Sequence, residues 1–427
     1  MKLHDIQALL EQSHGIDGFR IASTKRDSYE LFFVHRQLET VRATDTDTVS
    51  VTVYVRHDGK VGDSTFSVYG SLSEADVADR IAVATERAKL VYNEPFELTP
   101  GGTLHAELPS NLRENEPYDM AARIADAVFA ADCVNGGSIN ATEIFLYRDT
   151  VRIINSRGVD KTQVGYRAMI EAIPTFTEGT DSVELYEAYR FTEFDPARVT
   201  AEISKKMQEV SMRHRAKKPA TPLTANVVLR EKEIAELLGL LADDLDYASV
   251  YTQSNLHKKG DILQEDASAC DPLTLTRCGQ VRGCGRSAFF DSDGTPLTDT
   301  ILIRNGIVSA YSGTHRFATY LGEPETGDLP CLKLEPGSLS SKELDAEPWI
   351  ECVSMSGLQV DLYSDYIGGE IRLAYLHQGS DILPLTDISM SAKLTDVLKS
   401  LRLSDTITVE DNYEGPDKLL LHGVTIL

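Results

Sequence analysis

The segment at residues 227–261 constrains the fold most, because it joins a short apolar run to a strongly patterned helix. Val227-Val228-Leu229 is followed by a polar turn with two glutamates, which suit the positive end of a helix dipole. Leucines and one isoleucine then recur at intervals of three and four, the spacing of a single buried helix face: Ile234, Leu237, Leu238, Leu241 and Leu245. Gly239 lies in mid-helix, where it costs about 1 kcal/mol relative to alanine. The segment predicts a core helix with one glycine that its pattern does not explain.

The chain before this segment alternates between strand and helix patterns. Val49–Arg56 alternates apolar and polar residues, and His57-Asp58-Gly59-Lys60 predicts a hairpin turn into the next strand. Ser73 is expected to cap a helix whose buried stripe is Val77, Ile81, Ala84 and Ala88. A Pro/Gly-rich break is expected from Pro95 to Pro109.

A second helix is predicted at Pro117–Ala130. Strands are predicted on both sides of a tight turn at Asp149-Thr150, and another over Gln163–Ala172. Asp195-Pro196 starts a helix that ends in the basic segment 213–218, just before two prolines. We place the domain boundary there, which divides the chain into residues 1–218 and 219–427.

Beyond the central helix the pattern becomes rich in strands. Asn305-Gly306 predicts a type I′ hairpin between two apolar runs. Further strands are expected at Gly357–Leu362, Gly369–Tyr375, Asp381–Leu385 and Lys418–Val424, with a helix at Ser391–Leu401.

Charge and composition exclude several classes of protein. A formal net charge of -24 argues against a general nucleic-acid binder, which needs clustered Lys and Arg. No apolar run approaches the ~18 residues of a membrane span, and the N-terminus does not have the features of a signal peptide. The six cysteines are scattered without a Cys-x-x-Cys pair, which predicts reduced thiols in the cytoplasm.

The residues taken singly do not form a catalytic constellation. The sequence has no His-Glu dipeptide and no Gly-x-Ser-x-Gly motif. The loop 283–288 formally fits a dinucleotide-binding fingerprint, but the residues after it predict a turn, not the helix that such a loop must open. Asp291-Ser292-Asp293-Gly294 lacks the later ligands of a calcium loop, so we interpret it as a solvated turn. Cys284 is the most nucleophile-like cysteine by position, yet no adjacent base is identifiable.

The central helix resembles the zinc-binding helix of TldD, the catalytic half of the TldD/TldE (PmbA) family. Gly239, Leu240 and Asp244 take the places of its His-Glu-x-x-x-His motif. Weaker landmarks follow in family order: Asn155-Ser156-Arg157-Gly158, Glu325-Thr326-Gly327-Asp328, Leu385-Thr386-Asp387-Ile388-Ser389 and Tyr413-Glu414-Gly415-Pro416. TldD-like chains also carry a C-terminal cysteine that resembles a third metal ligand, whereas Val409–Leu421 has none. The chain therefore resembles the metal-free TldE/PmbA branch.

This resemblance implies an α+β fold: an N-terminal α/β domain with a mixed or antiparallel sheet and helices, then a β-rich, barrel-like C-terminal domain. It implies a subunit, not catalytic alone and without a cofactor, of a cytoplasmic TldD/TldE-type metallopeptidase that acts on peptides or unfolded proteins. Zinc is then expected only in a TldD-like partner, and the peptide-binding residues are unknown. Neither nucleic acid nor membrane is an expected partner, so the family's older association with DNA gyrase gains little support.

Two alternatives remain open at this point. The first is a divergent stand-alone metallopeptidase whose metal is held by scattered His, Asp and Glu side chains. The second is a homodimeric peptide-binding or regulatory protein without hydrolytic activity. Leu240 favours the non-catalytic subunit over the stand-alone metallopeptidase, since a leucine cannot act as a general base.

Overall fold

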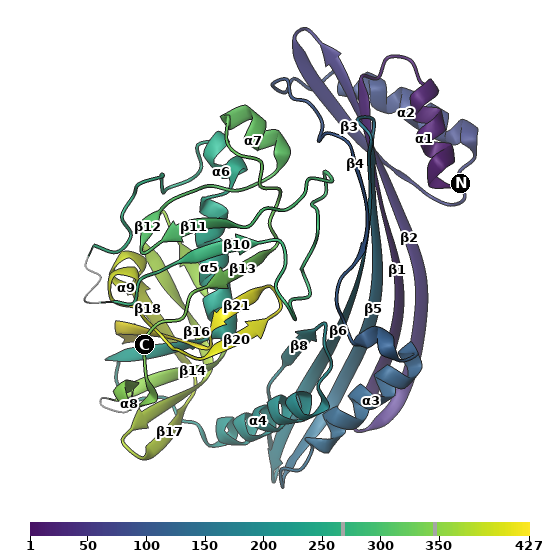
Figure 1. Cartoon of the computed structure of the whole chain (residues 1–427). Coiled ribbons are helices and arrows are strands. Elements are labelled where there is room, and N and C mark those ends of the chain that lie inside the picture. The colour runs from purple at the N-terminus through teal and green to yellow at the C-terminus, as the bar shows by residue number, and fades with distance from the viewer. Residues whose placement is uncertain (266–269, 345–347) are drawn as a thin grey trace.

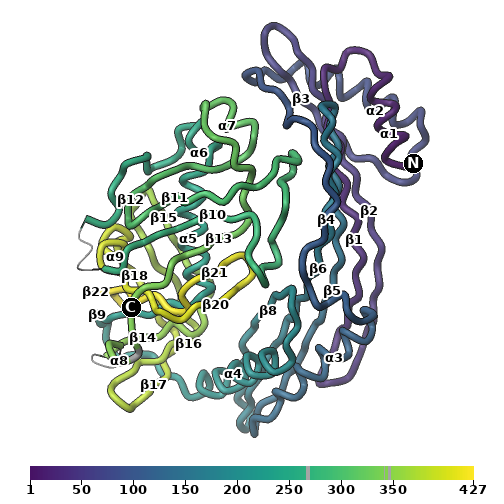
Figure 2. The backbone as a smooth tube through the Cα atoms, viewed as in Figure 1, coloured from purple at the N-terminus to yellow at the C-terminus, as the bar shows by residue number. Residues whose placement is uncertain are grey.

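The fold consists of a long curved sheet beside a compact β-rich part (Figure 1). It is a computed structural model that describes residues 1–265, 270–344 and 348–427. Figure 2 shows that the chain passes from the curved sheet through α4 into the β-rich part. This arrangement confirms the predicted α+β class, with its sheet-and-helix N-terminal part and its barrel-like C-terminal part.

The N-terminal sheet is built from very long antiparallel strands in the order β3-β2-β1-β5-β6-β4, and only β4 runs parallel to its neighbour. Two short strands, β7 and β8, pair with β6. The strands are β1 (Gly18–Val34), β2 (Gln37–His57), β3 (Lys60–Val68), β4 (Gly102–Glu107), β5 (Gly137–Asn155), β6 (Val159–Glu178), β7 (Asp181–Glu184) and β8 (Glu187–Phe191).

Amphipathic helices cover one face of this sheet. At one end of the sheet, α1 (Leu3–Gln12) and α2 (Glu74–Ala88) pack together, and the predicted capping box of Ser73 and Asp76 is present. At the other end, α3 (Pro117–Ala130) and α4 (Pro196–Arg215) bury their apolar stripes. Asp195 caps α4 by accepting the amide protons of Ala197 and Arg198, as its sequence predicts.

Two predictions for the sheet are wrong. The turn expected at Asp149-Thr150 lies inside the continuous strand β5, where both residues pair with β1 and β6. The polar side chain of Asp149 does not mark a turn, because Arg26 binds it with two hydrogen bonds of 2.6 and 2.9 Å across the sheet. The break expected at Pro95–Pro109 contains β4, and β1 had no predicted counterpart.

The C-terminal part contains a closed ring of five strands in the order β14-β9-β22-β18-β16, in which β16 pairs back to β14. Three short strands extend it. The eight strands are β9 (Leu223–Arg230), β14 (Trp349–Met355), β15 (Gln359–Asp361), β16 (Tyr366–Gln378), β17 (Asp381–Leu385), β18 (Ile388–Lys393), β19 (Arg402–Leu403) and β22 (Lys418–Ile426).

A second C-terminal sheet has the order β12-β11-β10-β13-β21-β20. Its strands are β10 (Leu275–Cys278), β11 (Thr300–Arg304), β12 (Ile307–Val308), β13 (Cys331–Leu334), β20 (Ile407–Glu410) and β21 (Tyr413–Pro416). Helix α5 (Glu231–Asp244) contacts both sheets, and its leucines form one apolar core with residues of β9, β13 and β22. The short helices are α6 (Tyr247–Tyr251), α7 (His315–Leu321), α8 (Ser341–Leu344) and α9 (Leu394–Ser400), with one 3-10 turn at Leu112–Glu114.

The C-terminal prediction is confirmed where local turn chemistry is strong. Asn305 and Gly306 adopt positive φ values of 49° and 74° between β11 and β12, as a type I′ turn requires. The helix expected at Ser391–Leu401 begins later, at Leu394, because the residues before it pair with β16 as strand β18. No helix within the described ranges has the length and apolar character needed to cross a bilayer.

Candidate functional site

Helix α5 places Gly239 and Leu240 away from its buried leucine stripe. The stripe residues are at most 2% exposed, whereas Gly239 and Leu240 are both half-buried. A Cβ atom added to Gly239 would meet no other atom within 4 Å, so close packing does not explain this glycine. Neither position offers a side-chain oxygen, nitrogen or sulfur atom, so neither could bind a metal ion or move a proton.

Asp244 has a hydrogen-bonding role in the loop that follows α6. Its carboxylate accepts the amide protons of Leu256 (2.6 Å) and His257 (3.0 Å) and lies 2.9 Å from Nδ1 of His257. Burial opposes its charge, but the hydrogen bonds from His257 and the two amides lower the pKa of Asp244 below its usual value. Both carboxylate oxygens are therefore used in fixing the loop, a role that no sequence pattern indicated.

Gly239, Leu240 and Asp244, which the sequence resemblance aligns with the zinc motif, do not fit a zinc ion. Zinc sites use thiolates, imidazoles or carboxylates at short distances, and here only Asp244 has such a group. Among the described residues, no three His, Cys, Asp or Glu side chains come together in an arrangement that could hold a metal. The described residues at these positions therefore do not provide a metal-dependent catalytic step.

Two cavities lie between the N-terminal and C-terminal parts. The first, of about 540 Å³, is lined by β5, β6 and the loop 280–287, which includes Cys284. The second, of about 300 Å³, is lined by β8, α4, the first turn of α5 and β20. Gly239, Leu240 and Asp244 are not among the described residues that line either cavity.

Half-buried carboxyl groups line the second cavity. Burial raises the pKa of Glu233 to about 7 and that of Glu410 to about 8, with nearby glutamates adding to the effect at Glu410. The hydroxyl of Tyr189 is buried in the same wall, and no partner for it appears among the described residues.

Ion pairs beside the second cavity connect α4 with the barrel. Arg230, at the junction of β9 and α5, lies 2.7 Å from Glu209 of α4 and 2.8 Å from Glu351 of β14. Burial opposes the charge on Glu351, but His377 and Arg230 together lower its pKa to about 2. Lys206 in turn lies within 3.0 Å of Glu187 and 2.7 Å of Glu209.

Two strand edges face the second cavity. β8 pairs with β6, and β20 pairs with β21, but the described residues supply no partner strand for the other edge of either. Residues of both strands line the cavity. An extended peptide can pair with an open strand edge through its main chain.

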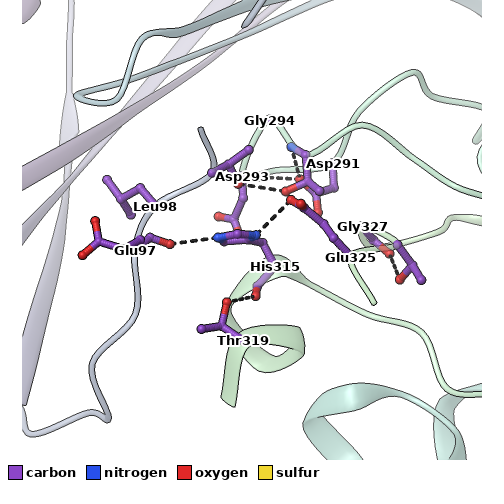
Figure 3. A network of polar contacts seen from close by, with 12 residues as sticks. Glu97, Leu98, Asp291, Asp293, Gly294, His315, Thr319, Glu325 and Gly327 are labelled. Carbon is purple, nitrogen blue, oxygen red and sulfur yellow. Dashed lines mark hydrogen bonds and ion pairs between the residues drawn. The ribbon is translucent and has the colours of Figure 1, made fainter. Parts of the chain in front are cut away.

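A separate polar contact joins the two parts of the chain around His315 of α7 (Figure 3). One ring nitrogen of His315 lies 2.9 Å from Glu325, and the other lies 2.8 Å from the carbonyl oxygen of Glu97. The expectation of a solvated turn at 291–294 is wrong, because this turn packs against the N-terminal sheet. Asp293 pairs with Arg20, and the Gly294 carbonyl accepts a hydrogen bond from buried Lys161.

The fold of the whole chain resembles those of three solved structures. TldE from Thermococcus kodakarensis aligns with a TM-score of 0.80 at 15% identity, over 99% of this chain and 98% of that one. A Thermotoga maritima protein named for a proposed modulation of DNA gyrase gives 0.79 at 15% identity, with 99% of both chains covered. A similarly named Bacteroides thetaiotaomicron protein gives 0.77 at 17% identity, over 99% of this chain and 97% of that one.

Sequence similarity is concentrated in the C-terminal part. No curated protein matches the chain in sequence. Residues 222–427 match the PmbA/TldA metallopeptidase C-terminal domain, and these residues comprise the closed ring, the second sheet and α5. Residues 222–427 therefore form a domain of the PmbA/TldA metallopeptidase family.

Proposed function

We propose that this chain is a TldE/PmbA-like, non-catalytic subunit of a TldD/TldE-type metallopeptidase complex that acts on peptides or unfolded proteins. The observation that carries the proposal is the chemistry of α5. A leucine stands in the place of the general base, a glycine in that of one zinc ligand, and the carboxylate of Asp244 is occupied by the loop after α6. Zinc and the activated water would then belong to a TldD-like partner.

In this complex the chain would hold the peptide. The open edges of β8 and β20 can each add an extended peptide strand through main-chain hydrogen bonds. When protonated, the carboxyl groups of Glu233 and Glu410 can donate hydrogen bonds to peptide carbonyls near these edges. Such contacts depend little on side-chain sequence, which suits a subunit that handles unfolded chains.

The outer edge of β2 would supply the contact with the partner. β3 pairs with β2 only over residues 49–57, so residues 40–48 have an edge with no described partner strand. This segment is exposed along almost its whole length. A second chain of the same fold could extend the sheet there, since unprotected strand edges readily pair with another chain. The six cysteines all lie in the described ranges and form no disulfide there, which suits a complex in the reducing cytoplasm.

The proposal is tested by mixing the purified chain with a TldD-like chain. We expect a complex on size-exclusion chromatography and cleavage of an unfolded peptide by the mixture at a rate that neither chain reaches alone. The double variant Val41→Lys and Ala43→Lys, on the open segment of β2, should weaken the complex, and Val83→Lys is its matched control. Val41 and Val83 are similarly exposed, at 49% and 50%.

Other outcomes would select the alternatives. Peptide cleavage by this chain alone, abolished by a chelator, would favour the stand-alone metallopeptidase. A homodimer that binds peptide but neither binds TldD-like chains nor cleaves peptide would favour the peptide-binding or regulatory protein.

A further inference from the structure

Three buried cysteines lie together at the wall of the first cavity. Cys278 at the end of β10 faces Cys331 at the start of β13 as a direct cross-strand pair. Cys284, in the loop after β10, belongs to the same apolar cluster. Their exposed fractions are 3%, 0% and 2% in the order Cys278, Cys331 and Cys284. The sequence separates these thiols by up to 53 positions, so only the fold brings them together.

Cys331 is the centre of this group. Cys331 packs in one cluster with Cys284, whose thiol lies 3.8 Å from the Tyr413 carbonyl oxygen, and the Ser287 hydroxyl oxygen lies 3.9 Å from the Cys331 sulfur. The hydrogen bond from Cys284 lowers the pKa of Cys331 despite its burial, and Ser287 assists. The same contact, together with burial, raises the pKa of Cys284. Cys331 therefore ionises first, while Cys284 keeps its proton as a donor.

A small molecule can approach this group through the first cavity. Cys284 and Ser287 both line the cavity, whose volume is about 540 Å³, and Cys331 is reached through Ser287, whose hydroxyl oxygen lies 3.9 Å from its sulfur. Cys133, by contrast, is exposed and belongs to a different part of the chain. The chain thus has one isolated surface thiol and one grouped set behind a cavity wall.

We propose that Cys284 and Cys331 form an oxidation site at which hydrogen peroxide produces a reversible intrachain disulfide. The Cys331 thiolate attacks one peroxide oxygen, the O–O bond breaks, and the hydroxide that leaves takes up a proton to become water. The Cys331 sulfenic acid is then attacked by the sulfur of Cys284. The S–S bond forms, the S–O bond breaks, and the Cys284 proton leaves with hydroxide as a second water. Two thiols are oxidised and one peroxide is reduced, and an external dithiol reverses the reaction.

The disulfide would tie the loop 280–287 to β13. This loop forms part of the cavity wall and also contacts the turn between β20 and β21, because the Gly285 amide donates to the Asp411 carbonyl (2.9 Å) and Arg286 pairs with Asp411 (3.3 Å). Oxidation would therefore fix the wall of one interdomain cavity beside the strand edge of the other. The site itself does not depend on the proposed subunit role.

The test uses the full-length chain with Cys133→Ser as background, because exposed Cys133 would react independently. After a stoichiometric amount of hydrogen peroxide, we expect the unfolded protein to show two fewer titratable thiols. Peptide mass spectrometry without reductant should find Cys284 linked to Cys331, and dithiothreitol should restore both thiols. Added Cys284→Ser should leave a Cys331 sulfenic acid that dimedone traps, whereas added Cys331→Ser should abolish the reaction.

A different result would overturn the proposal. The assignment fails if the linked peptides join Cys278 to either neighbour, if no thiols are lost, or if Cys284 reacts equally well without Cys331. Should either serine variant fail to fold, the linkage found in the Cys133→Ser background decides the outcome by itself.

Discussion

Arg230 offers the sharpest test of how the two parts of the chain are joined. Its guanidinium lies between Glu209 of α4 and Glu351 of β14, and the three side chains are 12%, 3% and 12% exposed. The substitution Arg230→Ala removes the cation that Glu209 and Glu351 share, and among the described residues leaves Glu209 only Lys206 and Glu351 only His377. Removing one partner from a buried ion pair costs about 3–5 kcal/mol, and we expect a loss of that size in the free energy of unfolding at pH 7.

The loss should depend on pH in a defined direction. Glu351 has a pKa lowered to about 2, so its pairing stabilises the fold above its ordinary pKa near 4.5 and is lost as the pH falls toward 2. In Arg230→Ala the two carboxyl groups can take up protons as the pH falls. The difference in free energy of unfolding between the variant and the wild type should therefore be smaller at pH 4 than at pH 7. Urea unfolding at both pH values, followed by far-UV circular dichroism, measures this difference in free energy of unfolding.

Two further variants complete this test. Arg372→Ala removes an exposed arginine whose hydrogen bond goes to Ser356 (2.8 Å), and it should change stability by less than about 0.5 kcal/mol. Adding Glu209→Gln to Arg230→Ala should recover part of the loss, because one buried charge is removed. A loss below about 1 kcal/mol for Arg230→Ala, or a loss that is the same at pH 7 and pH 4, would refute this account.

Three other perturbations have clear expected results. Gly239→Ala should stabilise the protein by about 0.5–1 kcal/mol, because its Cβ meets nothing within 4 Å and glycine is unfavourable in mid-helix. A lower free energy of unfolding in urea would instead show that the fold needs the glycine. Asp244→Ala removes contacts to two amides and an imidazole and should lower the free energy of unfolding by about 2–3 kcal/mol. Hydrogen exchange at the amides of Leu256 and His257 should become faster. Unchanged exchange would contradict the role of Asp244 in holding this loop. The raised pKa of Glu410 gives stability that is complete below pH 4.5 and lost as the pH rises through about 8. Melting temperatures from pH 6 to 9 should therefore fall less for Glu410→Gln than for the wild type, and equal slopes would count against the raised pKa.

The parts of the fold that sequence reasoning predicted correctly are those with strong local chemistry. Ser73 and Asp195 cap their helices as expected, and the Asn305-Gly306 turn forms. Each of these depends on contacts within a few residues of chain. The leucine stripe of α5 was also predictable, because its spacing defines one helix face, although distant strands form the core that it enters.

The failures occur where distant residues decide the structure. Asp149 looks like a turn residue, but Arg26 holds it inside a long strand from 123 positions away. The turn at 291–294 is polar in sequence, yet Asp291 and Gly294 are buried, and the N-terminal sheet supplies Arg20 and Lys161 as polar partners for the turn. The grouping of Glu233 with Glu410, and of Cys284 with Cys331, likewise has no local signal. The candidate sites were therefore only partly predictable.

The most direct test of the subunit role is the zinc content of this chain, measured by mass spectrometry after purification without chelator. The account predicts no stoichiometric zinc in the chain alone. In the mixture with a TldD-like chain it predicts zinc only in the partner, together with peptide cleavage. Near-stoichiometric zinc in this chain alone would contradict the account and require a metal site formed by other residues.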